Sequence, residues 1–238
     1  MKIGKVTYNG TASDTLGIFI SGSGSYNAAE DDLTAYSIPG RNGDLFIPNN
    51  RYKNIEVVYP AFIPNDFENR VQAVRNWLRS AKNYAKISDN YDTNHYRMGI
   101  GVGIVAFTPA QENVAANFQI TFNCKPQRFL NSGDTALTPT SGSTISNGYI
   151  YTALPLIEFT NPTSSATITI GTRTLTATAA YTGTVYVDCE TRNIYSGANN
   201  LNNYFSVTGD FPQLAPGNNT ITFSGVTSLK VYPRWWEL

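Results

Sequence analysis

The sequence has little charge of either sign. Asp, Glu, Lys and Arg make up 14% of its 238 residues, and 17 basic side chains balance 17 acidic ones. Globular proteins commonly carry about 25% charged residues. Zero net charge argues against a nucleic-acid clamp, because such a protein needs a surplus of Lys and Arg to neutralise phosphates. Hydrophobic residues make up 41% and aromatic residues 13%, which is enough to bury a sizeable core.

Cysteine and histidine, the residues that most often carry catalysis or bind metals, are also scarce. Cys124 and Cys189 are the two cysteines, and each lies in a strand-like run. Two thiols cannot form a tetrahedral zinc site or a disulfide framework, so we expect both to be buried and reduced. The acidic run Glu30-Asp31-Asp32 lacks the alternating ligand spacing of a calcium loop, so we expect a solvated loop there.

His95 is the only histidine, so a Ser-His-Asp or Cys-His centre would have to use it. It lies in the polar, turn-like stretch SDNYDTNHYRMG, where no nucleophile motif is nearby, and we expect a solvated loop residue. Together these shortages predict a protein that is not an enzyme and that holds no metal or other cofactor.

Long apolar runs are missing as well. No stretch approaches the ~20 apolar residues that span a membrane, and the N-terminus MKIGKVTYNG lacks the apolar segment of a signal peptide. We therefore expect a soluble protein, made and assembled in a cytoplasm, with no membrane partner.

Alternating apolar and polar residues predict short β-strands along most of the sequence. The clearest runs are NIEVVYPAFI (54–63), NFQITFNCK (117–125), ATITIG (166–171), TVYVDC (184–189), NTITF (219–223) and SLKVY (228–232).

One segment, residues 66–83, has helical periodicity instead. Its apolar residues recur at helical spacing and form one stripe; they are Phe67, Val71, Val74, Leu78 and Ala81. We expect Asn65 to be the N-cap, with Glu68 three residues later, and Trp77 to lie at the edge of the stripe.

A domain boundary is predicted near residue 131. The stretch 126–148 is rich in Pro, Gly, Ser and Thr, as linkers and strand-poor connections are. Residues 1–131 then form a mixed β domain with one helix. Residues 132–238 form a charge-poor, all-β domain of about the size of a sandwich.

The glycines of GIGVGIV (99–105) fall at every second position, which is not the spacing of a phosphate-binding loop. In a strand, Gly99, Gly101 and Gly103 leave one face without side chains. We expect another backbone or sheet to approach that face closely.

The stretch 38–59, IPGRNGDLFIPNNRYKNIEVVY, contains the turn dipeptides Pro-Gly and Asn-Gly. Arg41 and Asp44 carry opposite charges near the turn, where they can brace the loop internally or reach across an interface. Arg51, Tyr52 and Lys53 precede the next strand. A well-hydrogen-bonded hairpin and a subunit contact are both compatible with this pattern, since Arg and Tyr are favoured at interfaces.

This stretch, followed by one amphipathic helix and FNCKP, resembles the N-terminal half of distal tail (Dit) proteins of long-tailed phages and prophages of Gram-positive bacteria. YVDCETRNIYSG (186–197), FPQLAPGNNTITFSG (211–225) and the closing PRWWEL resemble the second half. The resemblance covers essentially the whole sequence in the family's order.

The resemblance implies a mainly β fold, with an N-terminal β-sandwich-like ring domain that carries one α-helix and a C-terminal galectin-like β-sandwich. It implies a homohexameric ring at the virion tail tip, assembled in the bacterial host cytoplasm. The ring would join the tail tube protein to a tail-associated lysin or fibre protein, support receptor-binding proteins, and let DNA pass without specific contact. Carried over by position, the candidate subunit-interface residues are Arg41, Asn42, Asp44, Arg51, Tyr52 and Lys53.

The C-terminal PRWWEL places Trp235 and Trp236 within the last four residues. In an extended backbone they point in opposite directions. We expect one to close the sandwich or pack between the domains, and the other to lie on the surface with Arg234 stacked on it. The three residues would then form a packing latch. The alternative is that the tryptophans stack on sugars in a carbohydrate-binding module that contacts host cell-wall saccharide. A cell-wall hydrolase has no support in the sequence.

Overall fold

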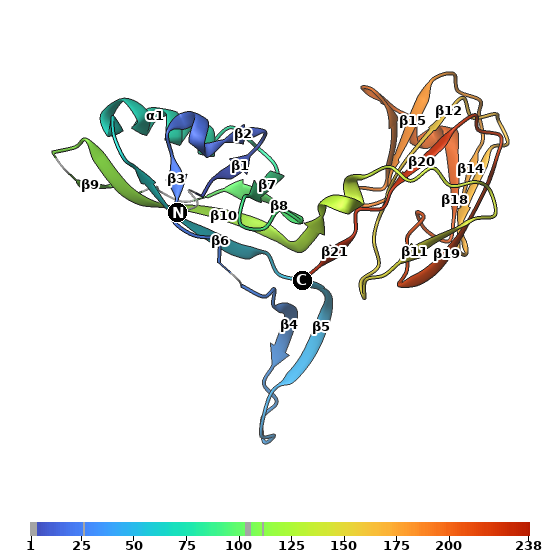
Figure 1. Ribbon diagram of the computed structural model, residues 1–238. Coiled ribbons are helices and arrows are strands. Elements are labelled where there is room, and N and C mark those ends of the chain that lie inside the picture. The colour runs from blue at the N-terminus through green and yellow to red at the C-terminus, as the bar shows by residue number, and fades with distance from the viewer. Residues whose placement is uncertain (1–3, 26, 103–105, 111) are drawn as a thin grey trace. The chain divides into compact units, whose positions relative to one another are not determined.

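The computed structural model describes residues 4–25, 27–102, 106–110 and 112–238. It is mainly β, as predicted, and α1 (Phe67–Leu78) is the one α-helix among these residues. Two compact units are formed: Met1–Arg128 with Leu238, and Phe129–Glu237 (Figure 1). Within the described residues, no helix is long and apolar enough to cross a membrane.

The first unit is built on one large sheet, in which β2-β1-β7-β8-β10-β6-β3 lie side by side and β9 pairs with β10. A short 3-10 helix, η1 (Ser13–Leu16), precedes β3. The strands are β1 (Val6–Tyr8), β2 (Thr11–Ala12), β3 (Phe19–Ile20), β6 (Ile55–Ile63), β7 (Ala85–Asp89), β8 (His95–Gly101), β9 (Thr108–Ala110) and β10 (Ala115–Leu130).

The core of the first unit lies between this sheet and α1. β6 and β10 pair antiparallel from Ile55↔Cys124 to Ile63↔Ala116, and every second residue of both strands is buried in this stretch. From the helix, Trp77 packs edge-on against Tyr8, with ring centroids 6.1 Å apart, and its indole N–H donates to the Tyr8 carbonyl oxygen at 3.3 Å. The apolar stripe predicted for the helix therefore faces the sheet, with Trp77 inside the core.

The predicted helix ends were wrong. The N-cap is Asp66, not Asn65, and it has left-handed backbone geometry (φ 58°) without a side-chain capping bond. Its carboxylate is used elsewhere: it accepts a hydrogen bond from the Asn69 side chain at 2.6 Å and lies 3.7 Å from Arg70 Nε. The helix stops at Leu78, where Arg79 N donates to Asn76 O and tightens the last turn.

The prediction of a bare glycine face in β8 is confirmed for Gly99 and Gly101. A Cβ at Gly101 would lie 2.5 Å from the Leu78 carbonyl oxygen at the end of α1, and one at Gly99 would lie 2.7 Å from Cys124 Sγ. The helix backbone and the neighbouring strand occupy the space that side chains would need. Gly103 lies outside the described residues.

The second unit consists of two five-stranded sheets that bury a common core. One sheet has the order β11 (Thr144–Asn147), β19 (Gly217–Ser224), β13 (Thr167–Ile170), β14 (Arg173–Ala177) and β18 (Phe205–Thr208). The other has β17 (Asn199–Asn200), β16 (Asn193–Ser196), β15 (Thr184–Asp188), β12 (Leu156–Thr160) and β20 (Leu229–Tyr232). A 3-10 turn, η3 (Asn202–Tyr204), precedes β18. All six strand runs predicted from the sequence are confirmed in position. Both cysteines are buried and free, as predicted.

The ends of the stretch 126–148 lie in strands, and its middle is the strand-poor connection that the sequence allows. β10 continues to Leu130, η2 (Asn131–Asp134) follows, and β11 begins at Thr144. Leu137 exchanges two backbone hydrogen bonds of 2.8 Å with Val231 of β20. This single bridge ties the segment to a strand that lies far away in the sequence.

The C-terminal segment packs onto the same stretch. Trp235 is buried in the core of the second unit. Its carbonyl oxygen accepts a 2.9 Å hydrogen bond from Leu130 N, and Arg234 N donates to Gly133 O at 2.9 Å. A Cβ on Gly133 would collide with the backbone nitrogen of Trp235. β21 (Trp236–Glu237) follows.

The side chains of Arg234 and Trp236 have separate partners. Arg234 makes a bidentate ion pair with Asp188, at 2.9 and 3.3 Å. Trp236 is half-buried; its ring stacks on Tyr151 with centroids 4.3 Å apart, and its indole N–H donates to Thr152 O at 3.0 Å. The predicted stacking of Arg234 on the surface tryptophan is therefore wrong. Arg234 pairs with the Asp188 carboxylate, and Trp236 stacks on Tyr151.

We predict that Trp235→Ala lowers the stability of the protein more than Trp236→Ala does. Truncating a buried tryptophan leaves a cavity and costs about 3–5 kcal/mol, whereas Trp236 is already partly in solvent. Differential scanning calorimetry measures the difference in Tm.

Deletion of residues 233–238 should also lower the Tm or cause aggregation, and a truncated form with the wild-type Tm would contradict the latch.

We also predict an acid-sensitive contribution from Asp188. Burial disfavours its charged form, but the Arg234 guanidinium and the backbone amides of Thr191 and Glu190 outweigh burial and lower the pKa of Asp188 below its usual range. A lowered carboxyl pKa stabilises the fold above the ordinary value of about 3.9 and loses that stabilisation as pH falls through the folded-state pKa.

Asp188→Asn keeps an oxygen for the Thr191 and Glu190 amides and removes only the charge. It should destabilise the protein by about 1–3 kcal/mol at pH 7, and the difference from wild type should shrink steadily below about pH 3.9. Urea unfolding across pH measures it. Asp44→Asn, on an exposed turn, is the matched control, and an equal loss there would rule out a specific effect of the Arg234 pair.

Candidate functional site

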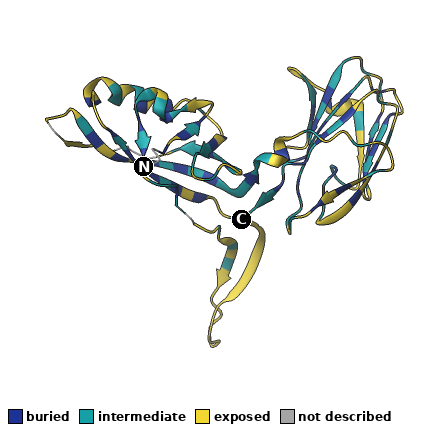
Figure 2. Ribbon diagram, in the orientation of Figure 1, coloured by how far each residue is buried: buried dark blue, intermediate teal, exposed yellow. Residues whose placement is uncertain are grey.

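A hairpin outside the large sheet is the most exposed feature of the first unit. β4 (Asp31–Tyr36) and β5 (Leu45–Tyr52) form a separate two-stranded sheet, with a register that runs from Leu33↔Pro48 to Tyr36↔Leu45. Figure 2 shows that it is exposed along almost its whole length. This element lacks the packing that supports the other strands. A two-stranded hairpin without such packing is marginally stable in water.

Large apolar side chains on the hairpin are open to solvent. Six of them are 39–58% exposed: Leu33, Tyr36, Ile38, Leu45, Phe46 and Ile47. Scattered exposed hydrophobes are ordinary, but a group concentrated on one element marks an interaction surface or an aggregation hazard. We call residues 31–52 the assembly hairpin.

All six interface residues predicted from the sequence lie on the assembly hairpin or at its base. Arg41, Asn42 and Asp44 lie in the exposed connecting turn, where Arg41 N donates to Ile38 O at 3.1 Å and Gly40 and Gly43 have positive φ angles of 81° and 84°. Glycine takes this backbone geometry without steric cost. Within the described residues, no ion pair joins Arg41 to Asp44, so internal bracing of the turn is not what is observed.

The base of the hairpin is held by two ion pairs. Arg51 Nε lies 2.5 Å from Asp32 Oδ2, and its hydrogen bond lowers the pKa of Asp32. Lys53 Nζ lies 3.6 Å from Glu30, and Lys53 N donates to Glu30 O at 2.8 Å. The acidic run 30–32 is solvated, as predicted, but it is not a loop throughout, because Asp31 and Asp32 begin β4. Tyr52 is half-buried opposite Asp31.

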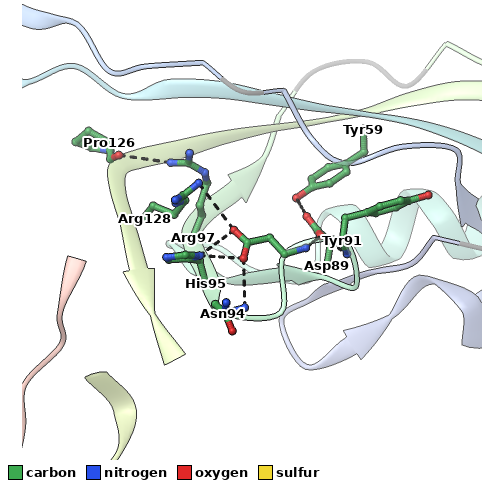
Figure 3. Close-up of polar contacts among 9 residues, drawn as sticks. Tyr59, Asp89, Tyr91, Asn94, His95, Arg97, Pro126 and Arg128 are labelled. Carbon is green, nitrogen blue, oxygen red and sulfur yellow. Dashed lines mark hydrogen bonds and ion pairs between the residues drawn. The ribbon is translucent and has the colours of Figure 1, made fainter. Parts of the chain in front are cut away.

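A second group of polar side chains gathers around His95 (Figure 3). His95 Nδ1 lies 2.9 Å from both oxygens of Asp92, and Arg128 Nη1 lies 3.9 Å from Asp92 Oδ2. The prediction of a solvated His95 was wrong: it begins β8, and its side chain is 16% exposed. The turn brings Asp92 back to it, since Asp89 Oδ1 accepts hydrogen bonds from the backbone of Tyr91 and Asp92.

The remaining groups of this cluster are also paired. Tyr59 OH donates to Asp89 Oδ2 at 2.8 Å, and burial together with the Asp89 charge raises the pKa of Tyr59. Arg97 Nη1 donates to Pro126 O at 3.4 Å, and burial lowers the pKa of Arg97. Burial likewise raises the pKa of the nearby Cys124 thiol to about 12, which keeps it protonated and unreactive.

Five of these side chains, those of Tyr59, Asp89, Asp92, Arg97 and Arg128, line a cavity of about 200 Å³ together with Ser23, Ser25 and Asn27. Two arginines and two aspartates balance in charge there, and in the described residues no group of three or more His, Cys, Asp or Glu is placed to hold a metal. The arrangement ties β6, β7, β8 and β10 together. Sequence reasoning missed it because its members are scattered over about seventy positions with no motif.

Comparisons with known proteins place this geometry in context. Residues 148–235 match the family model described as siphovirus-type tail component, C-terminal domain. Sequence comparison with curated proteins finds no match.

Among solved structures, the SPP1 Dit (gp 19.1) protein, a hub of the adsorption apparatus in phages that infect Gram-positive bacteria, superposes with a TM-score of 0.71 at 13% identity, covering 97% of this protein and 98% of its own length. A subunit of the phage p2 baseplate in its activated conformation superposes with TM-scores of 0.59 with Sr and 0.60 with Ca, at 9% identity, covering 96% of this protein and 97% of that one.

The structural likeness establishes the fold, and the family model adds a relation in sequence for most of the second unit. Residues 148–235 therefore match the model of the siphovirus-type tail component family, and the protein has the distal tail (Dit) fold over 97% of its length, as the sequence motifs predict.

Proposed function

We propose that this protein is a structural hub of a phage tail tip, in which six copies form a ring through the assembly hairpin. The observation that carries the proposal is the row of exposed apolar side chains on that hairpin, in a protein with the fold of a hub. A similarity to SPP1 Dit and to the p2 baseplate supports a structural role in the distal tail or baseplate.

The hairpin has the anatomy of a protein interface. Its middle carries the apolar side chains, while charged residues lie at its turn (Arg41, Asp44) and at its base (Arg51, Lys53). Stable interfaces commonly have an apolar centre and a polar rim. The Arg51–Asp32 and Lys53–Glu30 pairs add charged groups to the rim at the base.

In the proposed assembly the ring lies at the virion tail tip, is built in the host cytoplasm, and joins the tail tube protein to a tail-associated lysin or fibre protein. Receptor-binding proteins attach to it, and DNA passes through its channel without specific contact. The zero net charge of the protein suits a passage that must not retain DNA. The role is structural and non-enzymatic.

Carbohydrate binding by the paired tryptophans is less well supported. Trp235 is only 9% exposed, so its ring is not available to a sugar. Trp236 already stacks on Tyr151. A sugar would therefore meet one face of one ring at most.

We predict that wild-type protein assembles into rings and that Phe46→Glu prevents it. Loss of a central apolar contact commonly costs about 2 kcal/mol or more, or about thirtyfold in affinity, and a buried charge adds to that. Sedimentation velocity and negative-stain microscopy measure the assembly. Val207→Glu, which charges an exposed apolar residue in the second unit, should leave the rings intact.

Circular dichroism must show that both variants are folded. Rings that persist in Phe46→Glu would exclude the hairpin as the subunit contact. A wild-type protein that stays monomeric at high concentration, alone and with the tail tube protein, would overturn the hub itself.

A further inference from the structure

Three Asn-Gly dipeptides occur in the sequence: Asn9-Gly10, Asn42-Gly43 and Asn147-Gly148. This pair is chemically reactive because glycine has no Cβ to shield its backbone nitrogen from the preceding asparagine side chain. We infer that Asn42 is a site of spontaneous deamidation in the folded protein, and that the fold protects the other two asparagines.

The reaction needs only water. The Gly43 backbone nitrogen loses its proton to solvent and attacks Asn42 Cγ. A new bond from that nitrogen to Cγ closes a five-membered succinimide, and the bond from Cγ to Nδ2 breaks to release ammonia. Water then opens the ring at either of its two carbonyl carbons. The products are aspartate and isoaspartate. In isoaspartate the peptide bond to Gly43 is formed by the side-chain Cγ and not by the backbone carbonyl carbon. No oxidation or reduction takes place.

Three conditions set the rate in a folded protein: solvent must reach the pair, the amide groups must not be held by hydrogen bonds, and the backbone between Asn and Gly must rotate. Asn42 meets all three. It is exposed and lies between the ends of β4 and β5, in a stretch without regular structure. Gly43 has a φ of 84° and open space around its Cα. The Asn42 side chain forms no hydrogen bond with any described residue.

The Asn147 side chain is shielded from solvent and held by hydrogen bonds, although Gly148 itself is exposed. Asn147 is 2% exposed, and its side-chain nitrogen donates to Tyr151 O and Leu214 O at 2.9 Å each. Its side-chain oxygen accepts from Tyr149 N at 3.0 Å. Attack by Gly148 would require all three bonds to break.

Asn9 is exposed but fixed. It has a φ of 49° in the two-residue turn between the paired residues Tyr8 and Thr11. Its backbone nitrogen donates to Lys86 O at 3.2 Å, and its side-chain nitrogen donates to Ser80 Oγ at 3.3 Å. Rotation of the Asn9-Gly10 backbone would open this turn, which is of the kind that strand twist favours.

The test incubates the full-length protein at mildly alkaline pH, where the glycine amide is more readily deprotonated, and follows each dipeptide by peptide mapping and mass spectrometry. Asn42 should convert at least about tenfold faster than Asn9 and Asn147, which corresponds to about 1.4 kcal/mol of local opening at the protected sites. The same incubation in denaturant should bring the three rates together. Asn42→Gln keeps an amide at the turn and should abolish conversion there.

Equal rates at the three sites in the folded protein would overturn the inference. A ranking that survives in denaturant would do so as well, since local sequence and not the fold would then select Asn42.

Conversion also changes the turn that the proposed function assigns to subunit contact. Arg41 and Asp44 balance in charge, and a carboxylate at position 42 leaves the turn negative. This consequence rests on the proposed function: Asn42→Asp should weaken ring assembly while Asn42→Gln should not. Rings unaffected by Asn42→Asp would remove the consequence, whereas absence of rings in the wild type would count against the hub; peptide mapping decides the chemical step separately.

Discussion

The pairing of β10 with β6 is the constraint on which the first unit depends. Nine consecutive residue pairs hold these strands in register, and the alternation of buried and exposed positions follows from that register. A slip of one residue would turn Phe118, Ile120 and Phe122 towards solvent. β10 is also the strand that β9 joins, and its far end leads into the second unit. The large sheet and the surface that α1 covers thus depend on one ladder.

The assembly hairpin contrasts with this core. It is attached to the first unit through β6 and the segment before β4, but its apolar residues have no core to enter. Exposed strand edges and apolar side groups invite contact with other proteins. Two ion pairs join residues at the base of the hairpin, and two glycines with positive φ shape its turn. The energetic cost of such exposure is understandable in a protein whose proposed function is to assemble.

Because the protein carries few charges, individual ion pairs have identifiable structural tasks. Arg234 and Asp188 fix the C-terminal segment, Lys230 and Glu158 join two neighbouring strands, β20 and β12, and the Asp92 cluster closes the turn before β8. Each connects residues that are near in space and, in most cases, far apart in the sequence. These ion pairs therefore join separate segments of the fold.

The sequence by itself determined six of the strands and the presence of the helix, because apolar residues at every second or every third to fourth position leave a pattern in a short window. It also placed Arg41 to Lys53 on a hairpin, through turn dipeptides that act locally. It could not show that Asp92 holds His95, that Leu137 pairs with Val231, or that Gly133 admits the Trp235 backbone. Those contacts depend on segments brought together only by folding, so no local pattern records them. The exposure of Phe46 and its neighbours was decided in the same way: their side groups are apolar enough for a core, and only the tertiary structure leaves them outside one.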